Sequence, residues 1–182
     1  MSKTLKLVLV AILACLCQTN FVQYIRIAGV APDMLIVFAV LLTSYTGAYG
    51  CFCVSSLAAM LYDASVGYVL AVNLVSYAFM GWAAPNLRAF LDKRLRKLKH
   101  KSVMVMMIIC FFLTLLREII YIGYLFLIGS EQSVITVLRA LLCAGYSALM
   151  ILPAGFLLRR IMRWHLPARK KQADWVEEKP LQ

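Results

Sequence analysis

Four charged residues lie inside long apolar stretches of this chain, and they are its first candidates for chemistry: Asp63, Arg117, Glu118 and Arg139. Charged groups within membrane-spanning segments are costly, so such residues are functional candidates by default. They can form ion pairs that hold helices together, carry protons or ions, or present a polar site to a partner protein. The sequence leaves all three interpretations open. It contains no substrate-site motif beside the two carboxylates that would favour one of them.

The apolar stretches must be membrane spans for this argument to apply. The chain has 182 residues, of which 63% are hydrophobic and 15% charged. Its mean hydropathy is +0.84, whereas soluble chains are roughly half apolar and about one quarter charged. The composition therefore predicts an all-α integral membrane protein and leaves no room for a soluble catalytic domain. We do not expect an enzyme or a cofactor.

Basic residues define which side of the membrane each loop occupies. Residues 87–101 (LRAFLDKRLRKLKHK) contain seven of the 19 basic residues and one acid, Asp92. Short loops rich in Lys and Arg remain in the cytoplasm, so loop 86–102 and both chain termini are expected inside. The net charge of +11 is explained by these flanks, because they match the positive-inside rule and anionic lipid headgroups. We do not expect nucleic acid binding.

The same basic loop carries leucines at helical spacing. Leu87, Leu91, Leu95 and Leu98 recur along it, which favours an amphipathic helix on the inner membrane surface over a solvated charged loop. The residues expected to face anionic lipid or a cytoplasmic partner are Arg88, Lys93, Arg94, Arg96, Lys97 and Lys99.

Residues 33–84 contain no strongly charged break, so two long spans or three short ones both fit by length. Three spans keep Asp63 at the outer end of a helix and place the N-terminus inside. The first span is interpreted as uncleaved, with a signal peptide as the alternative. We therefore expect one bundle of six spans in a membrane domain over residues 1–160, followed by a cytoplasmic tail at 161–182. The expected spans are 5–22, 33–46, 48–63, 67–84, 103–128 and 134–158.

These spans place the charged residues relative to one another. Glu118 falls just outside the midplane, and Arg139 falls about 6 Å further out at about 1.5 Å per residue. We expect Asp63, Glu118 and Arg139 to form a cluster in the outer half of the bundle. Arg117 and Glu118 are adjacent, so they should point in different directions and not share one partner. The sequence leaves open whether Arg117 or Arg139 pairs with Glu118.

The six cysteines all lie in apolar segments, without the spacing of a zinc site or a disulfide framework. We interpret them as small buried hydrophobes. Alanines at 140, 144 and 148 are spaced so that helices can pack closely within a membrane, as are Ser55 and Ala59.

A series of short motifs resembles the rod-shape-determining protein MreD family. Pro32-Asp33 opens the second span, Asp63 closes the third, and Asn73 and Gly81 lie along the fourth, with Gln18 and Glu118 also matching. The turn after Asp63 lacks the Pro-Leu-Gly often seen in the family, and Arg117 beside Glu118 is unexpected there. Asp33 and Asn73 join the candidate site residues on the strength of this resemblance.

The resemblance implies a non-enzymatic subunit of the bacterial cell-elongation machinery, in the cytoplasmic (inner) membrane. Such proteins bind MreC and act with MreB, RodA and a class B penicillin-binding protein in lateral peptidoglycan synthesis. The family's fold is similar to that of the substrate-binding subunits of energy-coupling-factor vitamin transporters. Such a transport subunit is the alternative, although the short outer connections 64–66 and 129–133 leave little to cap a ligand. An unassigned membrane scaffold remains a third interpretation.

Overall fold

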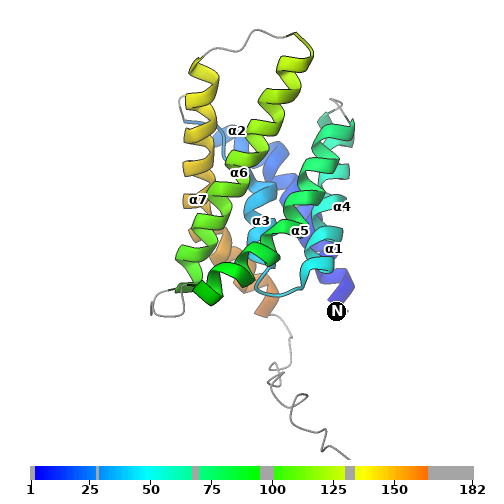
Figure 1. Cartoon of the computed structure of the whole chain (residues 1–182). Helices are drawn as coiled ribbons and strands as arrows, with labels where there is room; N and C mark the ends of the chain where they lie inside the picture. Colours follow the sequence, from blue (N-terminus) through cyan, green and yellow to red (C-terminus); the bar gives the residue numbers. More distant parts are fainter. Residues whose placement is uncertain (1–2, 28, 67–69, 95–100, 130–133, 164–182) are drawn as a thin grey trace, which may run out of the picture.

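The structure is a computed structural model that describes residues 3–27, 29–66, 70–94, 101–129 and 134–163. The described part is built from helices and connecting turns, with one isolated antiparallel bridge between Ile27 and Val30. Figure 1 shows the long helices standing side by side as a bundle. The expectation of an all-helical bundle is confirmed for this part of the chain.

Four helices are long and apolar enough to cross a membrane: Thr4–Tyr24, Ala48–Val66, Val103–Leu127 and Ile135–Ile161. The first comprises α1 (Lys3–Leu16), the π-helical turn η1 (Cys17–Phe21) and α2 (Val22–Tyr24). The others belong to α4 (Ala48–Val66), α6 (Lys101–Leu127) and α7 (Val134–Arg163). These helices correspond to the expected spans 5–22, 48–63, 103–128 and 134–158. A multi-pass membrane protein is therefore supported.

The span expected over 33–46 is much shorter in the structure. Helix α3 covers only Met34–Leu42, so it rises about 13.5 Å at 1.5 Å per residue, less than half of a ~30 Å hydrocarbon layer. All nine of its side chains are buried. Figure 1 shows α3 in the middle of the bundle, with α1, α4 and α5 on one side and α6 and α7 on the other.

Helix α3 ends after Leu42 in a tight turn that backbone and hydroxyl groups bond together. Thr43 Oγ1 donates to the Val40 carbonyl at 2.6 Å, and Thr46 N donates to the Leu42 carbonyl at 2.9 Å. Arg88 Nη1 then donates to Thr43 Oγ1 at 2.9 Å and to Ser44 Oγ at 2.7 Å, which ties this end of α3 to α5. The N–H groups of Thr43, Ser44 and Tyr45 bond to carbonyls three residues back, so the α-helical pattern ends here, in the half of the bundle that carries the basic residues.

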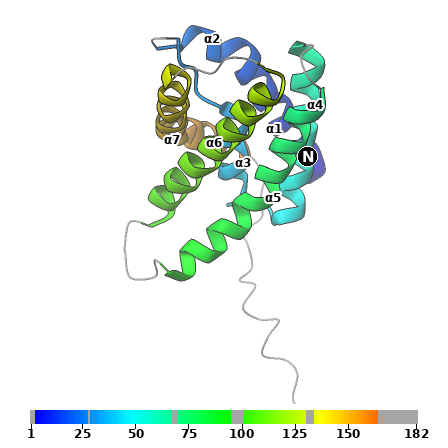
Figure 2. The same cartoon turned by 45° about the horizontal axis from the view of Figure 1, so that its top comes forward.

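Helix α5 (Leu70–Arg94) is also different from expectation. It continues through Pro85 into the basic segment, so residues 87–94 are the end of one long helix and not part of a separate surface helix. Leu87 and Leu91 pack against the core while Phe90 is exposed. Figure 2 shows α5 extending beyond the neighbouring helices at this end. Residues 95–100 of the expected surface helix lie outside the described residues.

Close packing joins α5 to α4. A Cβ added to Gly81 on α5 would lie 2.5 Å from Ser55 Oγ and 2.9 Å from the Cys51 carbonyl on α4. The absence of a side chain therefore sets how closely these two helices approach. The alanines at 140, 144 and 148 of α7 are buried as well, which places the small-residue face of that helix inside the bundle.

The outer faces of the helices are apolar. On α6, Met104, Ile108, Phe112 and Leu116 are exposed at a spacing of four residues, while Val105, Ile109 and Leu113 are buried. An apolar residue set that faces outward in this regular way is typical of a helix in contact with lipid or with another membrane helix.

Candidate functional site

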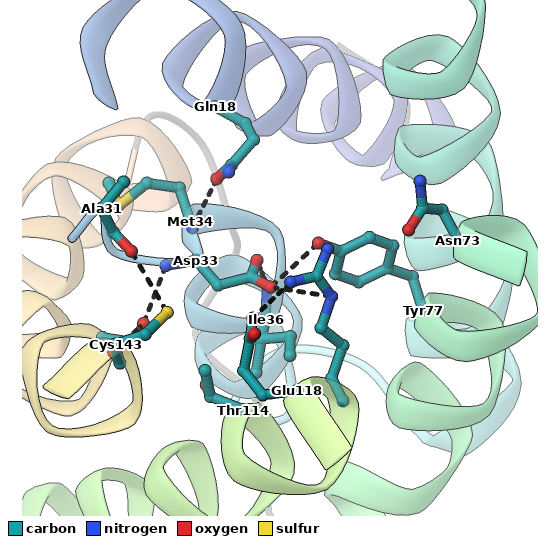
Figure 3. A network of polar contacts seen from close by, with 12 residues as sticks. Gln18, Ala31, Asp33, Met34, Ile36, Asn73, Tyr77, Thr114, Glu118 and Cys143 are labelled. Carbon is teal, nitrogen blue, oxygen red and sulfur yellow. Dashed lines mark hydrogen bonds and ion pairs between the residues drawn. The ribbon is translucent and has the colours of Figure 1, made fainter. Parts of the chain in front are cut away.

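Asp33 occupies the N-terminus of α3 in the interior of the bundle, where it is 3% exposed. Its Oδ1 accepts from the Ile36 backbone N–H at 3.2 Å, so it caps the helix. Its own N–H donates to Ser147 Oγ at 2.7 Å, and the Met34 N–H donates to Gln18 Oε1 at 2.7 Å. The first turn of α3 is thus held by side chains from η1 and α7, as Figure 3 shows for Gln18.

The second carboxylate oxygen of Asp33 joins α3 to α5 and α6. The Tyr77 hydroxyl donates to Asp33 Oδ2 at 2.9 Å, and Arg117 Nε lies 3.9 Å from the same oxygen. The Arg117 guanidinium lies 5.5 Å from the centroid of the Tyr77 ring and 5.4 Å from that of Tyr121. Figure 3 shows Tyr77 reaching from its own helix toward Asp33.

Glu118 completes this network by pairing with Arg117. We expected these adjacent residues to point in different directions and not to share one partner; in the structure they pair with each other. The long Arg117 side chain folds back, so that one guanidinium serves both Asp33 and the neighbouring Glu118. The group therefore contains two carboxylates and one guanidinium. We call Asp33, Tyr77, Arg117 and Glu118 the central network.

Asp63 and Asn73 form a separate contact. Asn73 Nδ2 donates to Asp63 Oδ1 at 3.1 Å, which links the end of α4 to the start of α5. Asp63 is 2% exposed, and its Oδ2 has no hydrogen-bond partner among the described residues. Its interactions are thus made across the α4–α5 connection and not with Glu118.

The expected cluster of Asp63, Glu118 and Arg139 does not form. Arg139 is exposed on α7, and within the described part of the chain it makes no ion pair with either carboxylate. It directly precedes the buried alanine face that begins at Ala140, and a step of one residue turns a side chain about 100° around the helix. Arg117 is therefore the arginine that pairs with Glu118.

Asp33, Arg117 and Glu118 of the central network line a polar cavity of about 580 Å³. Its walls come from η1 and α2, the segment before α3, the end of α4, and α6 and α7. A π-helical turn bordering a cavity is a frequent feature of functional sites. The cavity is large enough to hold a small polar molecule or side chains of another protein. Its lining includes Gln18, Asn20, Gln23, Arg26, Asp33, Tyr62, Arg117 and Glu118.

The six basic residues expected to face lipid or a cytoplasmic partner have different surroundings. Arg88 is partly buried in its contacts with the end of α3 and lies 3.6 Å from Asp92, so it has a structural role. Lys93 and Arg94 are exposed, and Arg94 lies 5.6 Å from the Phe90 ring centroid. Arg96, Lys97 and Lys99 lie outside the described residues.

Sequence reasoning missed Tyr77 and Ser147. Both are buried and both bond to Asp33, but neither carries a charge that would mark it within an apolar segment. The available signal for Ser147 was its place beside Ala148, in the stripe of small residues that faces the interior.

The described part of the chain gives little support to a metal site or a disulfide. It contains no group of three or more His, Cys, Asp or Glu side chains arranged to hold a metal ion. All six cysteines are free thiols. Cys53 is exposed, contrary to expectation, while Cys143 donates to the Ala31 carbonyl at 3.1 Å beside the polar cavity.

Comparison with models of known protein families, with curated proteins and with solved structures finds no match for this chain.

Proposed function

We propose that this chain is a non-enzymatic membrane subunit of the bacterial cell-elongation machinery, similar to MreD, that binds an MreC-like partner. In that role it helps organise lateral peptidoglycan synthesis together with RodA, a class B penicillin-binding protein and MreB. It is a multi-pass protein of the cytoplasmic membrane with both termini inside.

One observation carries this proposal: the residues of the MreD resemblance make the contacts that join the helices. Asp33 links α3 to α5 and α6, Asp63 links α4 to Asn73 on α5, and Gly81 packs against Ser55 on α4. Asp63 and Asn73, two residues of the resemblance, bond to each other, while Asp33 and Gly81 contact partners outside it. These contacts between helices support the resemblance, because residues that it includes hold the fold together.

An apolar groove on α7 supports a partner in the plane of the membrane. It has a volume of about 520 Å³ and is lined by Leu141, Leu142, Gly145 and Leu149, with Ile27 and Val30 beside them. A Cβ added to Gly145 would meet nothing within 4 Å, so the backbone of α7 is open to close approach there. Glycine at such a position lets a second transmembrane helix pack tightly. We place the single transmembrane helix of the MreC-like partner in this groove.

The basic end of the bundle supports the orientation. Arg88, Lys93 and Arg94 at the end of α5 lie at the same end as Arg159 and Arg160 of α7. Basic flanks of this kind remain cytoplasmic. The exposed charges then face anionic lipid or a cytoplasmic filament such as MreB.

The direct experiment is gentle purification of a tagged chain from its own host, followed by identification of the proteins that accompany it. We expect an MreC-like protein together with cell-wall synthases. Gly145→Leu should abolish this copurification, while Gly123→Leu on α6, where added atoms also meet open space, should not. Recovery of the partner with Gly145→Leu would exclude the groove, and its absence from the wild-type preparation would refute the proposed function.

A second experiment concerns the basic end. Charge reversal at Lys93, Arg94, Arg96 and Lys97 should weaken assembly at the membrane surface without unfolding the bundle. Unchanged copurification after this reversal would remove the proposed role of these residues.

The polar cavity favours a second candidate function. A cavity of about 580 Å³ bordered by amide and charged side chains is of the size that holds a small molecule. The alternative is therefore a substrate-binding subunit of an energy-coupling-factor vitamin transporter. A bound vitamin and an ATPase module in the same purification would establish it in place of the elongation subunit.

A further inference from the structure

A second cavity lies at the basic end of the bundle, away from the central network. It has a volume of about 240 Å³ and lies between the end of α3, the start of α6 and the last turns of α7. Most of its lining is apolar, including Leu41, Met106, Ile151 and Phe156. The side chains with polar groups in its lining are Ser44, Tyr45 and Arg159. We call it the basic-end cavity.

The shortness of α3 creates this cavity. Because α3 ends at Leu42, it does not extend further along α6 and α7, and the cavity lies between its last residues and these two helices. Gly155 on α7 adds to the space, since a Cβ placed there would already lie 3.4 Å from Leu41 Cδ2. A larger side chain at this position would occupy the cavity.

The cavity opens toward the surroundings of the bundle and not toward its axis. Leu152 and Phe156 line it and are 55% and 73% exposed, whereas Ile151 and Leu41 at its inner wall are 2% and 6% exposed. In a membrane protein this outer face contacts lipid. The apolar wall is therefore continuous with the lipid-facing surface of α7.

One positive charge lies at the mouth. Arg159 lines the cavity and is exposed. Ser44 also lines the cavity, and its hydroxyl accepts a hydrogen bond at 2.7 Å from Arg88 Nη1. Arg88 itself does not line the cavity, and it lies 3.6 Å from Asp92. The carbonyls at the end of α3 are already bonded to Thr43, Ser44 and Tyr45 N–H groups, which limits their repulsion of an anion.

An apolar slot that opens to lipid and ends at the Arg159 guanidinium and the Ser44 hydroxyl matches one kind of molecule. We propose that the basic-end cavity binds a single acidic phospholipid. One acyl chain lies along Ile151, Leu152 and Phe156, and the headgroup phosphate is bound by Arg159 and the Ser44 hydroxyl. Basic pockets between transmembrane helices on the cytoplasmic side bind acidic headgroups in this manner. The site is distinct from the exposed charges of Lys93 and Arg94, and it does not depend on which partner protein the chain binds.

Native mass spectrometry of the full chain in detergent, with phosphatidylglycerol or phosphatidylcholine added, tests this site. We expect one phosphatidylglycerol retained in preference to phosphatidylcholine. Arg159→Gln should lower its retention about fivefold, the effect of one basic group at a membrane surface. Arg160→Gln is the matched control, because Arg160 is exposed on the next position and does not line the cavity. If both variants lose phosphatidylglycerol equally, the attraction is a general effect of surface charge, and the proposed site is wrong.

The apolar half of the site has its own test. Gly155→Leu should displace the lipid by filling the cavity, whereas Gly145→Leu, on another face of α7, should leave it bound. Retention in Gly155→Leu would exclude the cavity as the acyl site. Inorganic phosphate is the further probe: if it competes as well as the lipid does, the cavity is an anion site and the lipid assignment is wrong.

A measurement on the unaltered chain remains decisive if a variant fails to fold. The wild-type protein in vesicles that contain a phosphatidylglycerol with a photoreactive acyl chain should cross-link mainly at residues 151–159 of α7 and 103–106 of α6. Cross-links distributed evenly around the bundle would refute the proposal.

Discussion

The Tyr77 hydroxyl on α5 donates a 2.9 Å hydrogen bond to Oδ2 of Asp33, the residue that caps α3. Both groups are buried, and Tyr77 is 2% exposed. A capping carboxylate at the start of a fully buried short helix needs partners on every side, because an unpaired charge in this environment is very costly. Tyr77 and Arg117 supply them from two other helices, so this one oxygen organises the centre of the bundle.

Tyr77→Phe should lower the free energy of unfolding by about 1 kcal/mol, within the range measured for single hydrogen bonds in membrane proteins. The ring remains beside Arg117, so only the hydroxyl is lost. Unfolding by sodium dodecyl sulfate in mixed micelles measures the change. Tyr121→Phe is the control, since the Tyr121 ring also lies beside Arg117 but its hydroxyl does not bond to Asp33. Equal effects of the two variants would contradict the role of the Tyr77 hydrogen bond.

Arg117→Gln should be more severe, by about 3–5 kcal/mol, because it leaves Asp33 and Glu118 without their shared cation. The double variant Arg117→Gln with Glu118→Gln should be less destabilised than Arg117→Gln alone, because one of the two stranded carboxylates is removed. The same unfolding experiment, arranged as a double-mutant cycle, gives the coupling between the two residues. Arg139→Gln should change stability little. A large loss of stability in Arg139→Gln would show that Arg139 has an interaction partner that the structure does not contain.

Substitutions of Asp33 should separate its capping role from its charge. Asp33→Asn keeps an oxygen that can accept from the Ile36 N–H, whereas Asp33→Ala removes the cap, which typically costs about 1 kcal/mol more. Both variants lose the ion pair with Arg117. We therefore expect both to be destabilised, Ala more than Asn, when melting temperatures are compared in one detergent. Asp92→Asn, at a half-exposed pair with Arg88, is the control and should have a small effect. An Asn variant as unstable as the Ala variant would argue against capping.

Gly81→Ala should destabilise the α4–α5 pair by about 1–3 kcal/mol, the usual cost of overpacking. The added Cβ would lie 2.5 Å from Ser55 Oγ and 2.9 Å from the Cys51 carbonyl, and a backbone oxygen cannot rotate away. Ser55→Gly in the same chain should restore part of the stability but not all of it, because the Cys51 contact persists. Gly123→Ala is the control, since a Cβ there meets nothing within 4 Å. Wild-type stability in Gly81→Ala would mean that the two helices do not approach this closely.

Local sequence rules succeeded where the cause is local. The pair Pro32-Asp33 predicted the start of a helix, and α3 begins at Met34 with Asp33 as its cap, because the cap is made by the residue itself with a neighbouring N–H. The long apolar segments predicted the four helices that are long and apolar enough to cross a membrane, since that requirement depends on length and composition alone. The length of α3 was not predictable in this way. It depends on the hydroxyls of Thr43 and Thr46 bonding back to the helix and on Arg88, which comes from another helix.

The sequence by itself determined that this is a helical membrane protein with a few costly buried charges, because hydropathy and charge are properties of each residue. It could not determine which charges meet. Arg117 and Arg139 are equally basic, yet Arg117 is directed inward to Asp33 and Glu118 while Arg139 is exposed. That difference arises from the rotation of each helix about its own axis, which is set by the packing of small residues such as Ala140 and Ala144 against the core. Only the tertiary structure shows how each helix is rotated.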